Sequence, residues 1–323
     1  MSMKPAQCGL FLLLLAFLFA GDQAREAEKL IAAAAEAEKA GQLQVAADLY
    51  QRAAGLRPQN FGAHYRGALL YLRAGHFPKA EGSLRKAIAV RPNSGPAHLN
   101  LGVALLQQGK KDEGRQEFVE ALRLDPRLTK AYHNLGVVEL GDGRLAEAEA
   151  LFKQALALDP TQQASYVRLG NVYVRQRKFA AALQILAQAA TLDPQDAQVF
   201  FNLGLAYVRL AQQEQALTAF KKALELNPSH AKASYNLGTL LIQMGRYQEA
   251  LPPLHEAIRL NPRLSDAYYN LAVAYAHLQD KESAVQWLKQ ALQLNPALAS
   301  EAQRDDDFKG LSSDPDFFTM TQH

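Results

Sequence analysis

The chain has 323 residues, of which 49% are hydrophobic and 21% are charged, and its formal net charge is +3 at pH 7. Lysine and arginine are interspersed with glutamate and aspartate, a pattern of solvated helix surfaces that argues against nucleic acid as a partner. Cys8 is the single cysteine, which excludes an internal disulfide framework and a cluster of thiolate metal ligands. The composition therefore predicts neither a metal nor a cofactor.

Residues 1–24 have the pattern of an export signal. Lys4 stands in a short polar start, an uncharged apolar run extends from Gly9 to Ala20, and charged sequence begins at Asp22. The run is about a dozen residues, shorter than the ~20 that a membrane-spanning helix needs. We expect cleavage near Ala20 and export to the bacterial periplasm or the medium. The alternative is an uncleaved anchor that tethers the chain to a membrane.

The organisation of the rest of the chain is clearest between Ala197 and Pro228. Apolar residues in this stretch follow helical spacing in two separate runs. The first run ends near Gln212, and the second ends at Asn227 because a residue before proline disfavours the α conformation. This stretch is predicted to form two helices joined by a short turn.

The same pattern recurs every 34 residues and predicts eight helical hairpins between residues 25 and 298. Prolines mark the hairpin ends at Pro58, Pro92, Pro126, Pro160, Pro194, Pro228, Pro262 and Pro296. A small residue recurs where the two backbones must approach closely, at Ala34, Ala68, Gly102, Gly136, Gly170, Gly204, Gly238 and Ala272. We place the repeats at 27–60, 61–94, 95–128, 129–162, 163–196, 197–230, 231–264 and 265–298.

This unit resembles the tetratricopeptide repeat. The family signature of an aromatic residue, Leu-Gly, Tyr, Ala, an aromatic residue and Pro reads here as Phe200, Leu203-Gly204, Tyr207, Ala216, Phe220 and Pro228. The resemblance implies an all-α, right-handed superhelical solenoid, forming one elongated domain whose first helices line a concave face. It also implies that the chain binds other proteins and is not an enzyme.

The turns inside the hairpins have their own sequence signal. Five of them contain a glycine suited to positive φ, at Gly41, Gly75, Gly109, Gly143 and Gly245. If the backbone is the same in the other repeats, strain of about 1 kcal/mol is expected at each of Arg177, Ala211 and Gln279. The residues placed to cap a following helix are Thr129, Asp196, Ser229 and Ser265.

Residues 299–323 break the repeat and form an acidic tail. Its apolar residues are predicted to cover the exposed end of the last hairpin, and they are Phe308, Leu311, Phe317 and Phe318. The alternative is that this tail lies in the basic groove and competes with a ligand.

Two columns of side chains are candidates for binding on the implied concave face. The first is an asparagine series, Asn100, Asn134, Asn202, Asn236 and Asn270, interrupted by Arg66 and Arg168. A carboxamide both donates and accepts, so such a row can pair with the backbone of an extended peptide whatever its sequence. The alternative is that these residues hold neighbouring hairpins together.

The second column lies next to the asparagines and carries Tyr65, Phe201, Tyr235 and Tyr269, with Val167 among its apolar members. Aromatic residues at a groove are good anchors for a partner. Positive charge nearby comes from Arg175, Arg209 and Lys232. Together these residues predict another protein as the partner, bound through an extended acidic or aromatic segment.

The family's dicarboxylate clamp for chaperone tails is only partly matched. Asn171, Asn202 and Lys232 stand at three of its five positions, but Val167 and Asn236 replace the two further basic residues. This departure argues against a chaperone tail as the ligand.

Catalysis has no support in the repeats, because no HExxH, GxSxG or P-loop motif occurs there. His64 and His98 take the place of a packing aromatic residue. We therefore predict a non-enzymatic scaffold or adaptor. The alternative function is a structural subunit of a self-assembling or envelope complex that uses its end repeats and convex face.

Overall fold

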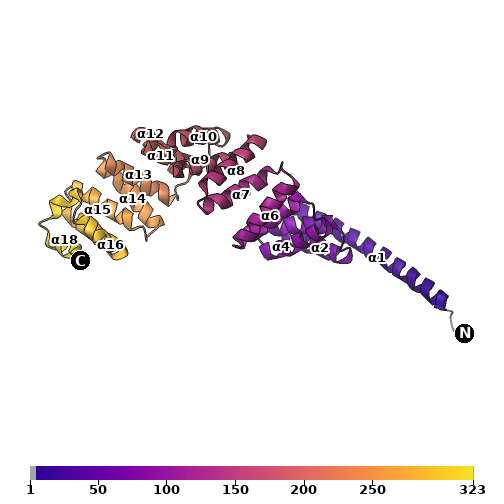
Figure 1. Ribbon diagram of the computed structural model, residues 1–323. Helices are drawn as coiled ribbons and strands as arrows, with labels where there is room; N and C mark the ends of the chain where they lie inside the picture. The colour runs from indigo at the N-terminus through magenta and orange to yellow at the C-terminus, as the bar shows by residue number, and fades with distance from the viewer. Residues whose placement is uncertain (1–4, 323) are drawn as a thin grey trace. The chain divides into compact units, whose positions relative to one another are not determined.

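The computed structural model describes the backbone of residues 5–322 and the side chains of residues 21–322 (Figure 1). Every element in this part of the chain is helical. The helices are α1 (Pro5–Lys39), α2 (Leu43–Leu56), α3 (Phe61–Arg73), α4 (Phe77–Val90), α5 (Gly95–Gln107), α6 (Lys111–Leu124), α7 (Thr129–Gly141), α8 (Leu145–Leu158), α9 (Gln163–Arg175), α10 (Phe179–Leu192), α11 (Ala197–Arg209), α12 (Gln213–Leu226), α13 (Ala231–Gln243), α14 (Tyr247–Leu260), α15 (Ser265–His277), α16 (Lys281–Leu294), α17 (Leu298–Ala302), η1 (Asp306–Leu311) and α18 (Pro315–Thr321).

Consecutive helices from α1 to α16 pack as antiparallel pairs, one pair for each predicted hairpin. The prediction of an all-α solenoid of helix-turn-helix repeats is confirmed. α1 is longer than the expected first helix and extends from Pro5, whereas the repeat pattern begins near Arg25. The predicted leader falls mainly on residues whose side chains lie outside the described part. Among the residues that were described, none of the helices has the length and apolar character to cross a membrane.

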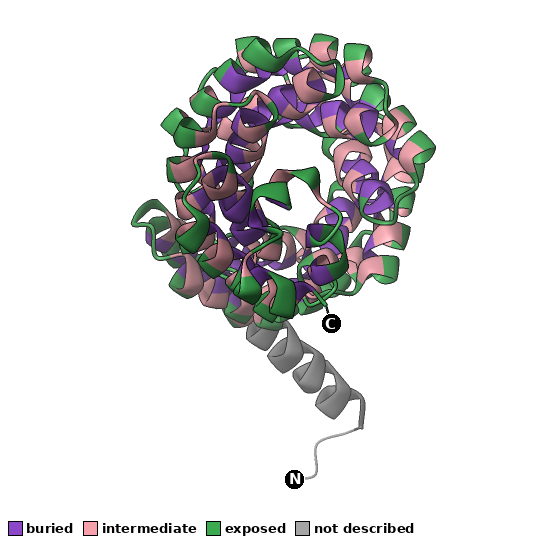
Figure 2. Ribbon diagram, turned by 90° about the vertical axis from the view of Figure 1, so that its left-hand side faces the viewer, coloured by how far each residue is buried: buried purple, intermediate pink, exposed green. Residues whose placement is uncertain are grey.

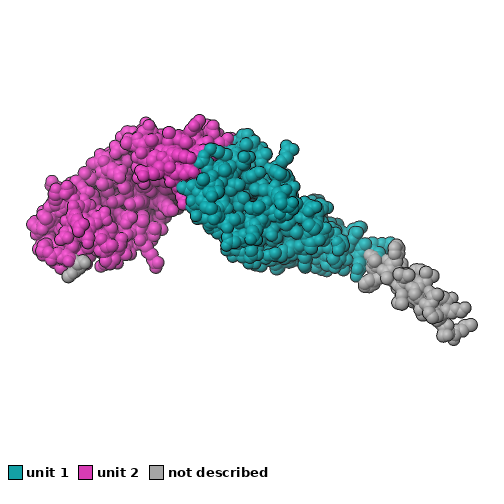
Figure 3. All heavy atoms as spheres, in the orientation of Figure 1, with its two compact units in different colours: residues 1–160 teal, residues 161–323 magenta. Residues whose placement is uncertain are grey.

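The array consists of two compact units (Figure 3). Unit 1 comprises residues 1–160 and contains α1 to α8, and unit 2 comprises residues 161–323 and contains α9 to α18. The expectation of one elongated domain stays a prediction. Stacked repeats contact only their neighbours, so an array has no single central core that must hold it together.

Within each pair the second helix places a large side chain on a small residue of the first. Phe118, Phe152 and Phe220 are fully buried, and each lies against a glycine of the partner helix. A Cβ built on Gly204 would lie 2.5 Å from Cδ1 of Phe220, so only glycine fits this contact. The buried parts of the helices lie between neighbours, and the connecting loops are exposed (Figure 2). The small-residue column is therefore the place where the two helices approach most closely.

The turns inside the hairpins share one backbone conformation whether or not they contain glycine. The five turn glycines have φ between 72° and 77°. Arg177, Ala211 and Gln279 have φ of 62°, 57° and 64°. The expectation that these three residues keep the glycine backbone is confirmed.

Replacing Ala211 with glycine is expected to raise the free energy of unfolding by about 1 kcal/mol, because a left-handed backbone strains every residue that has a Cβ. The measurement is chemical denaturation of the full chain. Gly245→Ala is the reciprocal control and should lower the same quantity. Equal stabilities of wild type and Ala211→Gly would contradict this account of the turns.

Only one of the four predicted helix caps is correct. The Asp196 side chain accepts a backbone N–H at the start of α11. At α13 the cap is the ring of His230, which accepts from Ala233 N–H at 3.2 Å. The remaining candidates lie one residue away from the cap position, and they are Thr129, Ser229 and Ser265.

The tail packs on the last hairpin. Phe308, Leu311 and Phe317 are buried in one cluster with residues of α15 and α16. Phe318 is 55% exposed, so the expectation that it also covers the hairpin is wrong. The reason is that α18 is only two helical turns long and packs a single face against the hairpin. Phe317 lies on that face.

Candidate functional site

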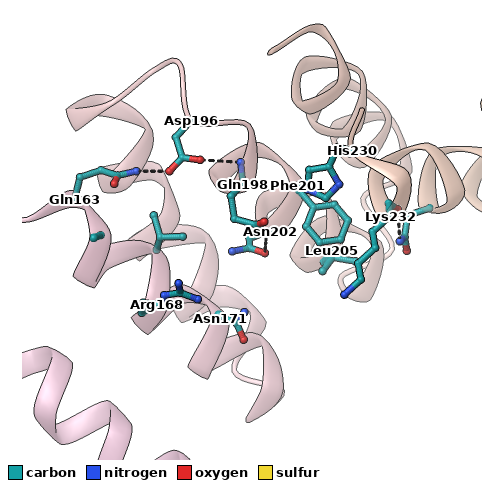
Figure 4. Close-up of a pocket in the computed structure, with 13 residues that line it drawn as sticks. Gln163, Arg168, Asn171, Asp196, Gln198, Phe201, Asn202, Leu205, His230 and Lys232 are labelled. Carbon is teal, nitrogen blue, oxygen red and sulfur yellow. Dashed lines mark hydrogen bonds between the residues drawn. The ribbon is translucent and has the colours of Figure 1, made fainter. Parts of the chain in front are cut away.

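Unit 2 contains a cleft of about 670 Å³ that crosses three consecutive first helices, α9, α11 and α13 (Figure 4). Its walls combine apolar side chains, carboxamides and two cations. The lining residues are Gln163, Ala164, Val167, Arg168, Asn171, Asp196, Gln198, Phe201, Asn202, Leu205, His230, Lys232 and Asn236.

Phe201 is the centre of the apolar part of the cleft. It is only 7% exposed, and its ring lies 6.0 Å from the ring of Phe220 on the partner helix. On its other side it packs against His230 at a ring distance of 4.7 Å. Val167 and Leu205 extend the apolar surface on α9 and α11. This surface can accommodate an apolar or aromatic side chain of a ligand.

Asn202 neighbours Phe201 and is the most unusual polar residue of the cleft. Its side chain is 3% exposed, and Oδ1 accepts from Nε2 of Gln198 at 3.0 Å. Nδ2 is also buried but has no hydrogen-bond partner among the described residues. Leaving a buried donor unpaired costs about 1–3 kcal/mol. The amide of Asn202 is therefore ready to donate to a carbonyl or carboxylate oxygen in the cleft.

The other asparagines of the column differ from Asn202 in this respect. Asn100 donates to the Tyr65 hydroxyl at 2.9 Å and to the Pro96 carbonyl at 2.8 Å. Asn270 donates to Oγ1 of Thr239 at 2.8 Å.

Asn236 lines the cleft, but its amide donates to the carbonyl of Lys232 on its own helix at 2.7 Å. Asn134 lies half-buried on α7 in unit 1. Of these asparagines, Asn100 and Asn270 thus link neighbouring repeats, as the alternative interpretation proposes, whereas Asn202 keeps a donor for the cleft.

Asp196 is the only carboxylate among the residues that line the cleft, and its oxygens are occupied. Oδ2 accepts from Nε2 of Gln163 at 2.7 Å, and Oδ1 accepts from the backbone N–H of Gln198 at 2.8 Å. Arg168 and Lys232 both have exposed side chains at the cleft. The balance of charge in the cleft is positive and suits an acidic ligand.

His230 contributes a neutral ring. Burial and, to a smaller degree, the charge of Lys232 lower the pKa of His230 below its ordinary value. Because Nδ1 accepts from Ala233 N–H, the proton of the neutral ring lies on Nε2. His230 therefore adds a further N–H donor to the cleft at neutral pH.

The cleft brings together part of the predicted site. Phe201, Asn202, Asn236 and Lys232 all line it. All five positions compared with the dicarboxylate clamp line it too, so Val167 and Asn171 belong to the same surface. Tyr65, Asn100 and Asn134 belong to unit 1 and are not part of it.

Besides Asn270, four other predicted residues of unit 2 lie outside the cleft lining. Arg175 and Arg209 are exposed at the C-terminal ends of α9 and α11. Tyr235 is half-buried on α13 and does not line the cleft, and burial raises the pKa of its hydroxyl. The expectation that Tyr269 faces an open groove is corrected, because its hydroxyl donates to Asp305 of the tail at 2.6 Å and its ring packs on Phe308.

Sequence reasoning did not assign four polar residues of the cleft lining to the site. Gln163 is the first residue of α9, Asp196 and His230 are the caps of α11 and α13, and Gln198 lies in the first turn of α11. Their common signal is a polar residue at the start of consecutive first helices. No group of three or more His, Cys, Asp or Glu side chains that could hold a metal ion occurs in the described part of the chain.

Family models match most of the repeat array. Two models of the tetratricopeptide repeat match residues 112–163, 201–262 and 235–299, and residues 139–203. A model of the middle TPR-like domain of cilia and flagella-associated protein 70 matches residues 30–126. No curated protein sequence matches the chain significantly.

Solved structures of the same architecture match as well. YrrB, described as a TPR protein with an unusual peptide-binding site, is 28% identical with a TM-score of 0.50, over 58% of this chain and 98% of that chain. PilF of Pseudomonas aeruginosa is 24% identical with a TM-score of 0.57, over 64% and 94%. The APC/C hetero-tetramer Cut9-Hcn1 is 19% identical with a TM-score of 0.59, over 78% and 49%. At these identities the last two show similarity of fold alone.

Proposed function

The chain belongs to the tetratricopeptide repeat family, and from this premise we propose that it is a scaffold that holds an extended segment of a partner protein in the cleft across α9, α11 and α13. The matches support a protein–protein interaction scaffold without catalytic activity. The site proposed here is narrower than the concave face as a whole. It is confined to one cleft of unit 2.

The observation that carries the proposal is the unpaired amide of Asn202. Its Nδ2 is buried in the wall of the cleft without an acceptor among the described residues. A backbone carbonyl of an extended peptide supplies the missing acceptor and removes the penalty of about 1–3 kcal/mol. Hydrogen bonds to the backbone of the peptide do not depend on its sequence, so the neighbouring side chains of the cleft determine which partner binds.

Those neighbours favour an acidic segment that also contains an apolar or aromatic residue. Phe201, Val167 and Leu205 form the apolar surface, and Arg168 and Lys232 supply positive charge beside it. The peptide-binding site described for YrrB is consistent with this use of the fold. From the pattern of residues 1–24 we also propose that the scaffold works after export or while tethered to a membrane.

The test uses peptides selected for binding to the full chain from a random twelve-residue display library, with affinity measured by fluorescence anisotropy. Asn202→Ala is expected to weaken binding about tenfold, which corresponds to ~1.4 kcal/mol. The same change should lower the free energy of unfolding by no more than ~1 kcal/mol, since it removes the hydrogen bond from Gln198 to Oδ1 together with a donor that has no partner among the described residues.

Asn270→Ala is the matched control, because it changes the same residue type in the same column outside the cleft. Its amide already donates to Thr239, so the variant should lose about 1 kcal/mol of stability and keep peptide affinity. Wild-type affinity in Asn202→Ala, or an equal loss in both variants, would show that the cleft is not the binding site.

A further inference from the structure

Unit 1 contains a second cavity, of about 370 Å³, between α2, α3 and α4 and next to the turn that joins α2 to α3. Much of its wall is apolar, with Ala54, Pro58, Ala89 and Val90. One molecule of liquid water occupies ~30 Å³, so the cavity is far larger than a site for a single bridging water. Two of its polar side chains each have one buried atom without a hydrogen-bond partner among the described residues.

His64 is the first of these side chains. It is 5% exposed, and its Nε2 lies 3.0 Å from the carbonyl of Pro58, which can only accept a hydrogen bond. The ring proton is therefore on Nε2, and Nδ1 presents a lone pair. Nδ1 has no hydrogen-bond partner among the described residues. Burial, with a smaller effect of Lys86, lowers the pKa of His64, so the ring is neutral at pH 7.

The next repeat shows how such a histidine is normally satisfied. His98 occupies the equivalent position and also approaches a proline carbonyl with Nε2, at 3.1 Å. Its Nδ1 lies 2.6 Å from the carboxylate of Glu117. The residue one repeat before Glu117 is Ser83, whose hydroxyl donates to the carbonyl of Lys79 at 2.9 Å. Ser83, at the position equivalent to Glu117, therefore does not pair with Nδ1 of His64.

Gln51 supplies a complementary group on the same wall. Its Nε2 is buried without a hydrogen-bond partner in the described part of the chain. This nitrogen lies 2.7 Å from where a Cβ of Gly67 would be, and Gly67 is one turn after His64 on the same face of α3. The amide donor of Gln51 therefore lies against α3 three residues after His64, whose lone pair is the acceptor, and both residues line the cavity. Lys86 adds an exposed ammonium group at the cavity.

We propose that this cavity binds a small organic acid that also carries a hydroxyl or amide group. The ligand donates an O–H or N–H to Nδ1 of His64 and accepts from Nε2 of Gln51, and its carboxylate lies near Lys86. A neutral imidazole, a carboxamide and an ammonium group recognise one donor, one acceptor and one negative charge. This site is distinct from the cleft of unit 2 in position along the chain and in every lining residue.

The test is titration of the full chain, labelled with ¹⁵N in its histidine rings, with L-glutamine or L-lactate. We expect a saturable shift of Nδ1 of His64 with at least one of them, while His98 serves as an internal control that does not shift. Acetate, which has no O–H or N–H donor when ionised, should bind at least tenfold more weakly.

Three variants and one control variant locate the binding. Ser83→Glu places a carboxylate where it can pair with Nδ1 of His64, as Glu117 does with His98. His64→Tyr fills the site with the aromatic residue that other repeats have at the equivalent positions, Tyr132, Tyr166 and Tyr268. Both should weaken binding at least tenfold, and His98→Tyr should not. Lys86→Ala changes an exposed side chain and cannot prevent folding, so it tests the carboxylate contact independently.

Failure of both probes to shift His64, unchanged affinity in Ser83→Glu or Lys86→Ala, or density for water only in crystals soaked with the probes would overturn the proposal.

Discussion

Phe308→Ala is expected to lower the free energy of unfolding by about 3–5 kcal/mol, the range for truncating a buried aromatic side chain. Phe308 is 1% exposed and lies in η1, outside the repeats. Its ring packs edge-on against Tyr269 at 5.4 Å and near Phe317 at 5.8 Å. The variant leaves a cavity in the cluster that covers the last hairpin.

Because the stability of a repeat array is a sum of local terms, the loss should be confined to the end of unit 2. Hydrogen exchange is expected to accelerate in α15 and α16 and to stay unchanged in unit 1. Phe318→Ala is the control, since Phe318 belongs to the same tail but is 55% exposed, and its cost should be within ~0.5 kcal/mol. A small effect of Phe308→Ala, or equal effects of both variants, would contradict a structural role of the tail.

Gly204→Ala is expected to destabilise unit 2 by about 1–3 kcal/mol, although alanine is the better helix former by ~1 kcal/mol. The added Cβ would lie 2.5 Å from Cδ1 of Phe220, a side chain that is fully buried and cannot move without displacing its neighbours. Urea denaturation measures the change. Gly82→Ala is the control, because nothing lies within 4 Å of the added Cβ in α4, and it should be neutral or stabilising.

Adding Phe220→Leu to Gly204→Ala is expected to recover part of the loss. Two repeats already combine alanine with leucine at these positions, as Ala68 with Leu84 and Ala272 with Leu288, and all four side chains are buried. A leucine can rotate away from the Cβ, whereas a phenyl ring in this place cannot. The free energy of unfolding of the double variant should exceed, by at least ~1 kcal/mol, the value expected from adding the effects of the two single changes. Additive effects would show that steric contact is not the reason for the glycine.

The sequence alone identified part of the candidate site. Phe201 and Asn202 were predicted from their columns and Lys232 from the positive charge nearby, and all three line the cleft. Tyr235 and Tyr269 were predicted from the same aromatic column as Phe201 and do not line it. A column fixes on which face of the helix a residue lies, and this holds for every repeat. It does not show what the neighbouring repeat or the tail places against that face.

The sequence by itself determined the period, the helix pairs, and the positive φ of Arg177, Ala211 and Gln279, because these features depend on local spacing and turn geometry. The tertiary structure alone decided which polar groups stay unpaired. Among the described residues, Nδ2 of Asn202 has no acceptor whereas Asn100 donates to Tyr65, and Nδ1 of His64 has no partner whereas that of His98 contacts Glu117. The physical reason is that these hydrogen bonds join side chains that pack together from different helices, so their satisfaction depends on one residue at one place in the packed array.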